Sequence, residues 1–219
     1  MTKIANQDLA KVLSRANECL RRLIEAGLSY DDLQIPIDNP DARARLVACW
    51  KNLPKSLKLI SGKEKIMIEA LDGQATIANA KDTFKSYLDA NFENWGLNTS
   101  GPATPETLLD VHEMIEDANF TQIFTGLNTD LDKLVLTQAQ IIRFCAKHPT
   151  WLRQEGHATF FLIKKDMSKP AIADNLFVVS VHVDSDGLRV SVHRFERARV
   201  WDAGYRHRLV VPQLNTSAI

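Results

Sequence analysis

The sequence has no apolar run close to the roughly 18 residues that a membrane-spanning helix requires. Its opening residues, MTKIANQDLAKV, also lack the apolar centre of a secretory signal. The three cysteines, Cys19, Cys49 and Cys145, are odd in number and far apart, which argues against a disulfide framework or a zinc knuckle. Together these absences predict a cytoplasmic protein that has no membrane segment.

The chain as a whole has no excess of either charge, and its middle has no positively charged residue. Lys and Arg together number 27, as do Asp and Glu, so no overall field attracts nucleic acid or an anionic membrane. Between Ser86 and Asp132 there is no Lys or Arg, although nine acidic residues occur there. From Lys133 onward, thirteen basic residues outnumber seven acidic ones. The middle of the chain is therefore acidic and its C-terminal part is basic.

Motifs with a known catalytic mechanism are absent as well. The chain has no GxSxG elbow, GxGxxG fingerprint, Walker loop or kinase motif set, and none of the zinc spacings HExxH, CxxC or HxH. Cys145 and His148 could touch on one predicted helix, but the apolar neighbours of Cys145 favour a buried thiol over a reactive pair. We therefore expect no cofactor and no metal, and we favour a non-enzymatic function over a catalytic one.

One stretch, residues 175–195, combines alternating side chains with turn chemistry and predicts a β-hairpin. Valines alternate with polar residues on both arms, as they do on strands that bury one face. A two-residue type I′ turn at Asp186-Gly187 would pair Val183 with Val190 and Val181 with Val192. We expect the valine face to pack on the core and the other face to be displayed, with Ser180, His182, Asp184, Arg189, Ser191 and His193.

Helical spacing of apolar residues predicts helices over residues 6–27, 39–53, 82–94, 104–118 and 137–148. The last of these begins with a capping box, in which Thr137 and Gln140 bind each other's backbone. Alternation predicts strands at residues 57–59, 66–68, 156–165 and 209–212, although residues 55–95 permit either short strands or short helices.

The combined expectation is an α+β protein. Residues 1–95 form a largely helical N-terminal region, and residues 104–212 form an α+β C-terminal domain around the hairpin 175–195. In that domain an antiparallel sheet of three to four strands packs against helices. The stretch 96–104, GLNTSGPAT, is the expected linker, and the tail 213–219 is expected to fray.

His157, His182 and His193 are the candidates for metal or acid/base chemistry. His182 and His193 share the polar hairpin face, and His157 joins them if its strand is adjacent and in phase. A zinc site would need three or four ligands converging on one point. We favour the alternative, in which these imidazoles lie on an exposed polar face of the sheet.

Arginine is concentrated near the C-terminus and alternates there with aromatic residues. Guanidinium forks bind phosphate and carboxylate, and aromatic rings can stack on bases. We favour ion pairs inside the chain or across a protein interface over nucleic acid or a small anion as the role of these residues. The candidates are Arg189, Arg194, Arg197, Arg199, Trp201, Tyr205, Arg206 and Arg208.

Several runs of the chain are distinctive: DLDKLVLTQAQIIRFCAKHPTWLR from Asp130, the following GHATFFLI and the closing YRHRLVVPQL, with SGKE at Ser61 and NWG at Asn94. In these runs the chain resembles a family of uncharacterised bacterial hypothetical proteins. The resemblance implies a bacterial origin and carries over no catalytic residue.

From the residues together we expect a cytoplasmic, non-enzymatic binding or protein-interaction protein that uses an arginine-rich surface of the C-terminal sheet. Its partner would be an unknown protein or a second copy of the chain. Nucleic-acid binding through the same segment is the first alternative. An enzyme or metal site on the histidine-bearing hairpin face is the second.

Overall fold

The computed structural model describes residues 21, 24, 29–42, 56–62 and 64–213. By its contacts the chain divides into two compact units, Met1–Leu53 and Pro54–Ile219. In the first unit, helix α2 spans Tyr30–Asp38, and Ser29 and Asp32 close a capping box at its start. The predicted helix over residues 6–27 lies almost entirely outside the described residues.

The start of the second predicted helix is described, and it has the expected cap. The side-chain oxygen of Asn39 accepts hydrogen bonds from the backbone N–H groups of Asp41, at 2.9 Å, and Ala42, at 3.1 Å. This is how an asparagine satisfies the first free donors of a helix. Residues 43–53 of that prediction lie outside the described part of the chain, as do residues 214–219 of the predicted tail.

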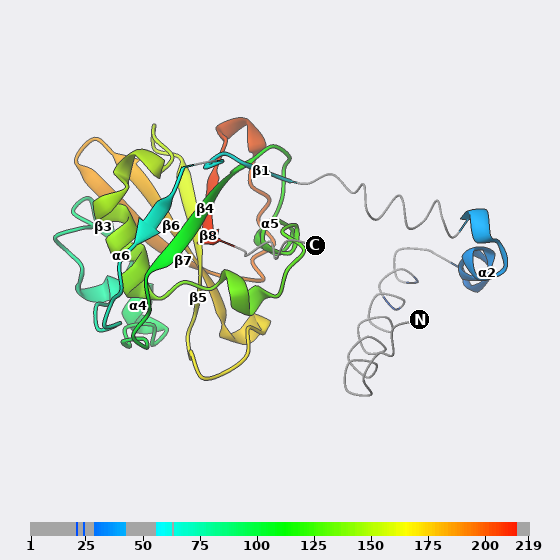
Figure 1. Cartoon of the computed structure of the whole chain (residues 1–219), viewed down its shortest axis with the longest axis horizontal. Coiled ribbons are helices and arrows are strands. Elements are labelled where there is room, and N and C mark those ends of the chain that lie inside the picture. The colour runs from blue at the N-terminus through cyan, green and yellow to red at the C-terminus, as the bar shows by residue number, and fades with distance from the viewer. Residues whose placement is uncertain (1–20, 22–23, 25–28, 43–55, 63, 214–219) are drawn as a thin grey trace. The chain divides into compact units, whose positions relative to one another are not determined.

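Within residues 56–213 the structure has one sheet of eight strands (Figure 1). β5 pairs parallel with β8 and β3 pairs parallel with β7, whereas the other neighbours are antiparallel. In spatial order the strands are β1 (Leu57–Leu59), β4 (Thr107–Met114), β8 (Arg208–Pro212), β5 (Ala158–Lys164), β6 (Leu176–Asp184), β7 (Gly187–Arg194) and β3 (Tyr87–Leu88), while β2 (Ile66–Ile68) also pairs with β4.

This mixed sheet shows that the predicted fold class is wrong. The prediction gave a helical N-terminal region and a C-terminal antiparallel sheet of three to four strands, but β1, β2 and β3 come from residues 57–88 and join the same sheet. The predicted helix over residues 104–118 is strand β4, and the predicted helix over residues 82–94 contains β3 and the single turn α4 (Asn91–Asn94). The predicted linker, residues 96–104, lies inside the second unit.

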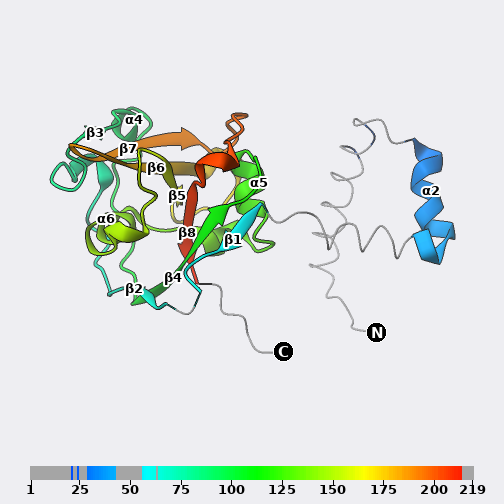
Figure 2. The ribbon, with the colours of Figure 1, turned by 90° about the horizontal axis from the view of Figure 1, so that it is seen from above.

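The centre of the sheet is buried on both faces, by two separate hydrophobic cores. Along β5, Phe161 and Ile163 belong to the first core, whereas Phe160 and Leu162 belong to the second. Helix α6 (Gln138–Lys147) packs on the first core and helix α5 (Phe120–Thr125) on the second, so the two helices lie on different sides of the central strands (Figure 2). A strand between two cores has no polar face, which explains why every residue from Ala158 to Ile163 is buried.

Shorter elements connect the sheet and the helices. Helix α6 begins with the predicted capping box, in which the Thr137 side chain accepts from the N–H of Gln140 and the Gln140 side chain accepts from the N–H of Thr137. None of the described helices is long and apolar enough to cross a membrane. The 3-10 helices are η1 (Ile77–Asn79), η2 (Leu131–Leu134), η3 (Pro149–Trp151), η4 (Ala173–Asn175) and η5 (Ala203–Tyr205).

The predicted hairpin is present, but its register differs from the prediction by two residues. β6 and β7 pair Val181 with Val190, and Asp184 with Gly187, so the turn is Ser185-Asp186. Neither turn residue has a positive φ, which excludes the predicted type I′ turn. Gly187 has φ +138°, and a Cβ there would lie 3.1 Å from the Cβ of Lys85. The glycine is therefore needed where the chain before β3 crosses the hairpin.

β3 covers only part of the outer edge of β7. Tyr87 and Leu88 pair with Arg189 and Val190, and the N–H of Asp89 donates to the carbonyl of Val190. Beyond that point the Asp89 carboxylate accepts a hydrogen bond from the N–H of Val192 at 3.2 Å. A side chain thus continues the pairing where the strand ends.

Candidate functional site

The chain that follows β7 forms an exposed loop between two buried anchors. Phe195 is 4% exposed and packs against the Phe124 ring at 6.0 Å between centroids, and Trp201 is 6% exposed. Trp201 also exchanges two backbone hydrogen bonds with Ala118, at 2.9 and 3.2 Å. All five residues between the anchors, 196–200, are exposed. We call residues 194–200 the arginine loop, and its anchors hold it against the second core.

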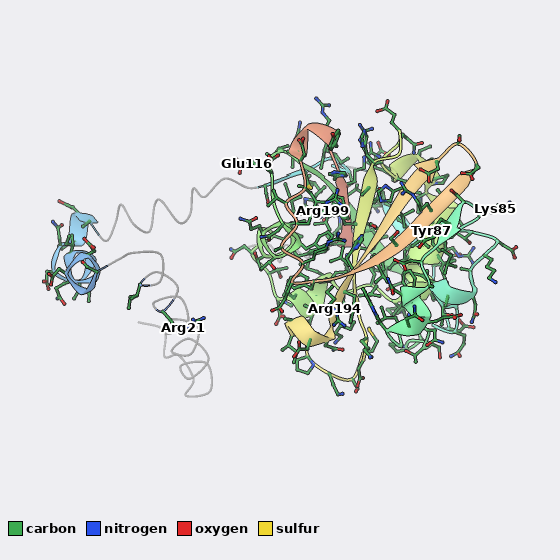
Figure 3. All side chains as sticks on the ribbon, turned by 180° about the vertical axis from the view of Figure 1, so that it is seen from behind. Arg21, Lys85, Tyr87, Glu116, Arg194 and Arg199 are labelled. Carbon is green, nitrogen blue, oxygen red and sulfur yellow. The ribbon has the colours of Figure 1, made fainter. Side chains whose placement is uncertain are left out.

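Two arginines of the loop stack on tryptophan rings. The guanidinium carbon of Arg194 lies 5.1 Å from the centroid of Trp95, and that of Arg199 lies 4.4 Å from the centroid of Trp201. Figure 3 labels both side chains, Arg194 at the end of β7 and Arg199 on the chain that follows it. A cation over an aromatic face is held by the ring quadrupole, so each of these flexible side chains has a preferred position.

The third arginine of the loop is held by a histidine. Arg197 donates a hydrogen bond from Nη1 to Nδ1 of His193 at 2.8 Å, and the opposite nitrogen, Nε2, lies 3.1 Å from Oγ of Ser180. Because arginine can only donate, Nδ1 carries no proton and Nε2–H donates to the serine. Burial, together with the Arg197 charge, lowers the pKa of His193 to about 4. The histidine is therefore neutral at physiological pH and acts as an acceptor.

Four exposed arginines have no carboxylate partner among the described residues: Arg194, Arg197, Arg199 and Arg206. The other two arginines of the predicted set bind groups of the second unit itself. Nε of Arg189 lies 2.9 Å from the Asp184 carboxylate, and Nη1 of Arg208 donates to the carbonyl groups of Thr150 and Leu152, each at 3.2 Å. The predicted set of arginines therefore separates into two structural residues and four with free charge.

Tyr205 and Arg206 lie beside the buried anchor Trp201. The rings of Tyr205 and Trp201 lie 5.9 and 5.1 Å from the ring of His207, which is 5% exposed. Tyr205 is 50% exposed and stacks on His157 at 4.8 Å. Arg206 has φ +51° after the 3-10 helix η5, and its side chain is exposed. With the arginine loop, these two residues form what we call the arginine surface.

The three predicted histidines do not converge on one point. Nδ1 of His182 donates to the carbonyl of Gly156 at 2.9 Å, His193 binds Arg197 and Ser180, and His157 stacks on Tyr205. Within the described residues no group of three or more His, Cys, Asp or Glu side chains is placed to hold a metal ion. The least exposed imidazole among the described residues is that of His207, which was not among the predicted site residues. Its Nδ1 accepts from the N–H of Ala158 at 3.1 Å, and burial lowers its pKa to about 4.

The Cys145 and His148 side chains also have no catalytic arrangement. Cys145 is 2% exposed, and burial raises the pKa of its thiol far above the ordinary value. Nε2 of His148 lies 2.9 Å from the carbonyl oxygen of Met67, so this histidine is bound to β2. A thiol that stays protonated is a poor nucleophile.

The polar face of the hairpin, which we expected to be displayed, is covered by the second core at Ser180 and His193, and Asp184 and Arg189 remain partly exposed. Ser180 is fully buried, and the His193 ring packs at 5.8 Å from Phe120 and 6.2 Å from Trp201. The exposed arginines therefore come from the end of β7 and the loops after it rather than from the face of the sheet. Trp95, which supports Arg194, was not predicted as a site residue, because nothing in its local sequence indicates a contact with residues so far along the chain.

Comparisons with protein-family models, with curated proteins and with solved structures find no significant match to this chain. The resemblance described from its sequence runs therefore stays a prediction.

Proposed function

We propose that this chain is a binding protein that holds an acidic segment of a protein partner on its arginine surface. The observation that carries the proposal is the group of four exposed arginines without a carboxylate partner among the described residues. Unpaired guanidinium groups on an anchored loop are available to carboxylate or phosphate groups of a partner. Such groups accept two parallel hydrogen bonds from one guanidinium.

Stacking on tryptophan supports this role because it leaves the hydrogen-bond donors free. The ring quadrupole attracts the face of the guanidinium, whereas the five N–H groups of arginine lie in its plane. Arg194 over Trp95 and Arg199 over Trp201 can therefore stay stacked and still donate to an anion. A side chain that is already positioned loses less conformational entropy on binding.

Exposed apolar residues in the same surface favour a protein partner over nucleic acid. Val200 is 58% exposed and Tyr205 is 50% exposed, and tyrosine and arginine are enriched at protein interfaces. Single-stranded nucleic acid would need aromatic faces for its bases, but Arg194 and Arg199 already cover Trp95 and Trp201.

The test is a fluorescence-anisotropy titration of the full chain with three labelled probes: a polyglutamate peptide, a phosphoserine peptide and a single-stranded oligonucleotide. We expect the peptides to bind and expect Arg197→Ala and Arg199→Ala each to weaken that binding about tenfold, the effect of one charge-assisted hydrogen bond. Arg199→Lys keeps the charge but loses the fork, so it should fall between wild type and alanine.

The matched control is Lys58→Ala. Lys58 is an exposed cation on β1, at the opposite edge of the sheet from β7, and it should not affect binding of the peptides. Binding of the oligonucleotide that exceeds binding of the peptides and weakens steeply with salt would replace the proposal with the nucleic-acid function. Equal loss of peptide binding in Lys58→Ala and Arg199→Ala would show a non-specific charge effect and would overturn it as well.

A further inference from the structure

A cleft of about 730 Å³ lies between residues 96–101 and residues 163–175. The start of helix α6, at Thr137 and Gln138, forms part of its lining. Its volume is within the range of small-molecule sites, which are about 300–1,000 Å³. The arginine loop contributes no residue to it. The residues that line this cleft are therefore different from those that carry the function proposed above.

Both walls of the cleft are fixed by hydrogen bonds. In the wall 163–175, the buried side chain of Asn175 accepts from the N–H of Asp166 at 2.8 Å and donates to the carbonyl groups of Asp166 and Pro170, at 2.9 and 3.1 Å. In the other wall, Nε2 of Gln138 donates to the carbonyl of Leu97. A site whose walls are already ordered loses little free energy to rearrangement when a ligand binds.

Most charges of the cleft neutralise one another. The half-buried ammonium of Lys164 lies 2.8 Å from the Asp132 carboxylate, and the exposed ammonium of Lys169 lies 3.2 Å from the Asp166 carboxylate. Hydrogen bonds from the side chain and the N–H of Ser168, together with Lys169, lower the pKa of Asp166 to about 2. The charges of these two ion pairs are therefore already neutralised within the protein.

Two charges of opposite sign are left over, Lys165 and Asp174. Both are exposed, and neither has an ion pair or a side-chain hydrogen bond within the described residues. The Lys165 side chain reaches across to the opposite wall, where a Cβ on Gly96 would lie 3.6 Å from its ammonium nitrogen. Gly96 thus leaves space beside this ammonium, and the ammonium can serve a ligand rather than the protein.

The remaining lining includes apolar residues. Leu136 and Ile163 are buried, whereas Ile172 is 57% exposed. A ligand with an apolar body would remove the Ile172 side chain from water, at about 25 cal/mol for each Å² that is covered.

From these features we infer that the cleft binds a small zwitterion with an apolar body, such as an aliphatic amino acid. The anionic group of the ligand pairs with Lys165, its cationic group pairs with Asp174, and its hydrocarbon part covers Ile172. A ligand that carries only one charge would leave either Lys165 or Asp174 unpaired.

The experiment uses the isotope-labelled full chain and follows backbone amide shifts during titration with four probes. Leucine and 6-aminohexanoate are zwitterions with different charge separations, hexanoate carries only the negative charge, and hexylamine carries only the positive charge. We expect at least one zwitterion to shift amides of residues 96–101 and 163–175 and to bind about fivefold more tightly than either singly charged probe, as one additional exposed ion pair provides.

Two variants assign the contacts. Lys165→Ala should weaken the bound zwitterion to the affinity of hexylamine, and Asp174→Ala should weaken it to the affinity of hexanoate. Lys58→Ala and Asp186→Ala are the matched controls, since both residues are exposed and lie outside the cleft lining, and they should leave the affinity unchanged.

Two results would overturn the inference. One is that neither zwitterion binds more tightly than hexanoate and hexylamine. The other is that the shifted amides lie outside the two walls. A failure of the arginine surface to bind peptides would not change the zwitterion affinities or the positions of the shifted amides. The two proposals can therefore be rejected separately.

Discussion

The guanidinium carbon of Arg199 lies 4.4 Å from the centroid of the Trp201 ring, and Trp201 is itself 6% exposed. On its other sides this ring contacts Phe160 at 4.7 Å and Phe120 at 5.5 Å. One tryptophan therefore connects the second hydrophobic core with the arginine surface. Its loss should affect the stability of the unit strongly, whereas loss of the arginine should affect mainly binding.

Trp201→Ala is expected to lower the free energy of unfolding by about 3–5 kcal/mol, because it removes a large side chain from a packed core. Arg199→Ala should lower it by about 1 kcal/mol at most, the size of an exposed cation–π contact. Urea unfolding of both variants measures the difference, with the exposed Val200→Ala as a control that should change little. Equal losses for Trp201→Ala and Arg199→Ala would contradict this assignment.

Stability is expected to fall as the pH is lowered from about 6.5 to about 4. Burial lowers the pKa of His193 and of His207 from the ordinary 6.5 to about 4, so in this window the unfolded chain binds protons that the folded chain does not. The free energy of unfolding must therefore decrease toward acid and level off above pH 6.5. Urea midpoints across this range test it, and His193→Gln should reduce the slope. A urea midpoint that rises as the pH is lowered from 6.5 to 4 would contradict the lowered pKa values of these two histidines.

Gly73→Ala is expected to be strongly destabilising, by about 3 kcal/mol, because it combines an unfavourable φ with a steric clash. Gly73 has φ +77°, and an added Cβ would overlap the carbonyl oxygen of Pro102. Gly62 is the matched control: its φ is +53°, but no described atom lies within 4 Å of an added Cβ. Gly62→Ala should therefore lose only about 1 kcal/mol. Similar unfolding temperatures for the two variants would show that the contact with Pro102 does not constrain the chain.

Thr137→Ala is expected to lower the free energy of unfolding by about 0.5–2 kcal/mol, the usual effect of losing a helix cap. The substitution leaves the N–H of Gln140 without its partner, and Gln140 is 5% exposed, so water cannot easily replace the bond. Thr121→Ala, at an exposed position of helix α5, is the control and should have little effect. Urea unfolding distinguishes them, and a larger loss for Thr121→Ala would be evidence against the cap.

Local signals in the sequence identified elements whose backbone partners are local. Helix α6 was predicted because its capping box lies within four residues, and the presence of the β6–β7 hairpin was predicted because its arms are adjacent. The register of the hairpin could not be predicted. A shift of two residues keeps every side chain on the same face, so alternation fits both registers. The segment Lys85-Ser86, which packs against the hairpin at Gly187, is distant in sequence.

The elements that were predicted wrongly depend on distant partners. β4 places Leu109 and Val111 in the first core and Met114 in the second, so its apolar residues recur at a spacing that also suits a helix. The same holds for the candidate site. Clustered arginines marked the arginine surface, but which of them are free depends on Asp184, Thr150 and Leu152, and on the distant Trp95.

The bond from the Val192 N–H to the Asp89 carboxylate has a further consequence for molecules in concentrated solution. A strand at the edge of a sheet can recruit a strand from another copy through its free N–H and carbonyl groups, and this is how sheets grow into aggregates. β3 occupies that edge of β7 at Arg189 and Val190, and the carboxylate occupies the next donor and adds a negative charge. Without the Asp89 carboxylate, the N–H of Val192 would be free to pair with a strand of another copy. Asp89 therefore protects this edge of the sheet against self-association.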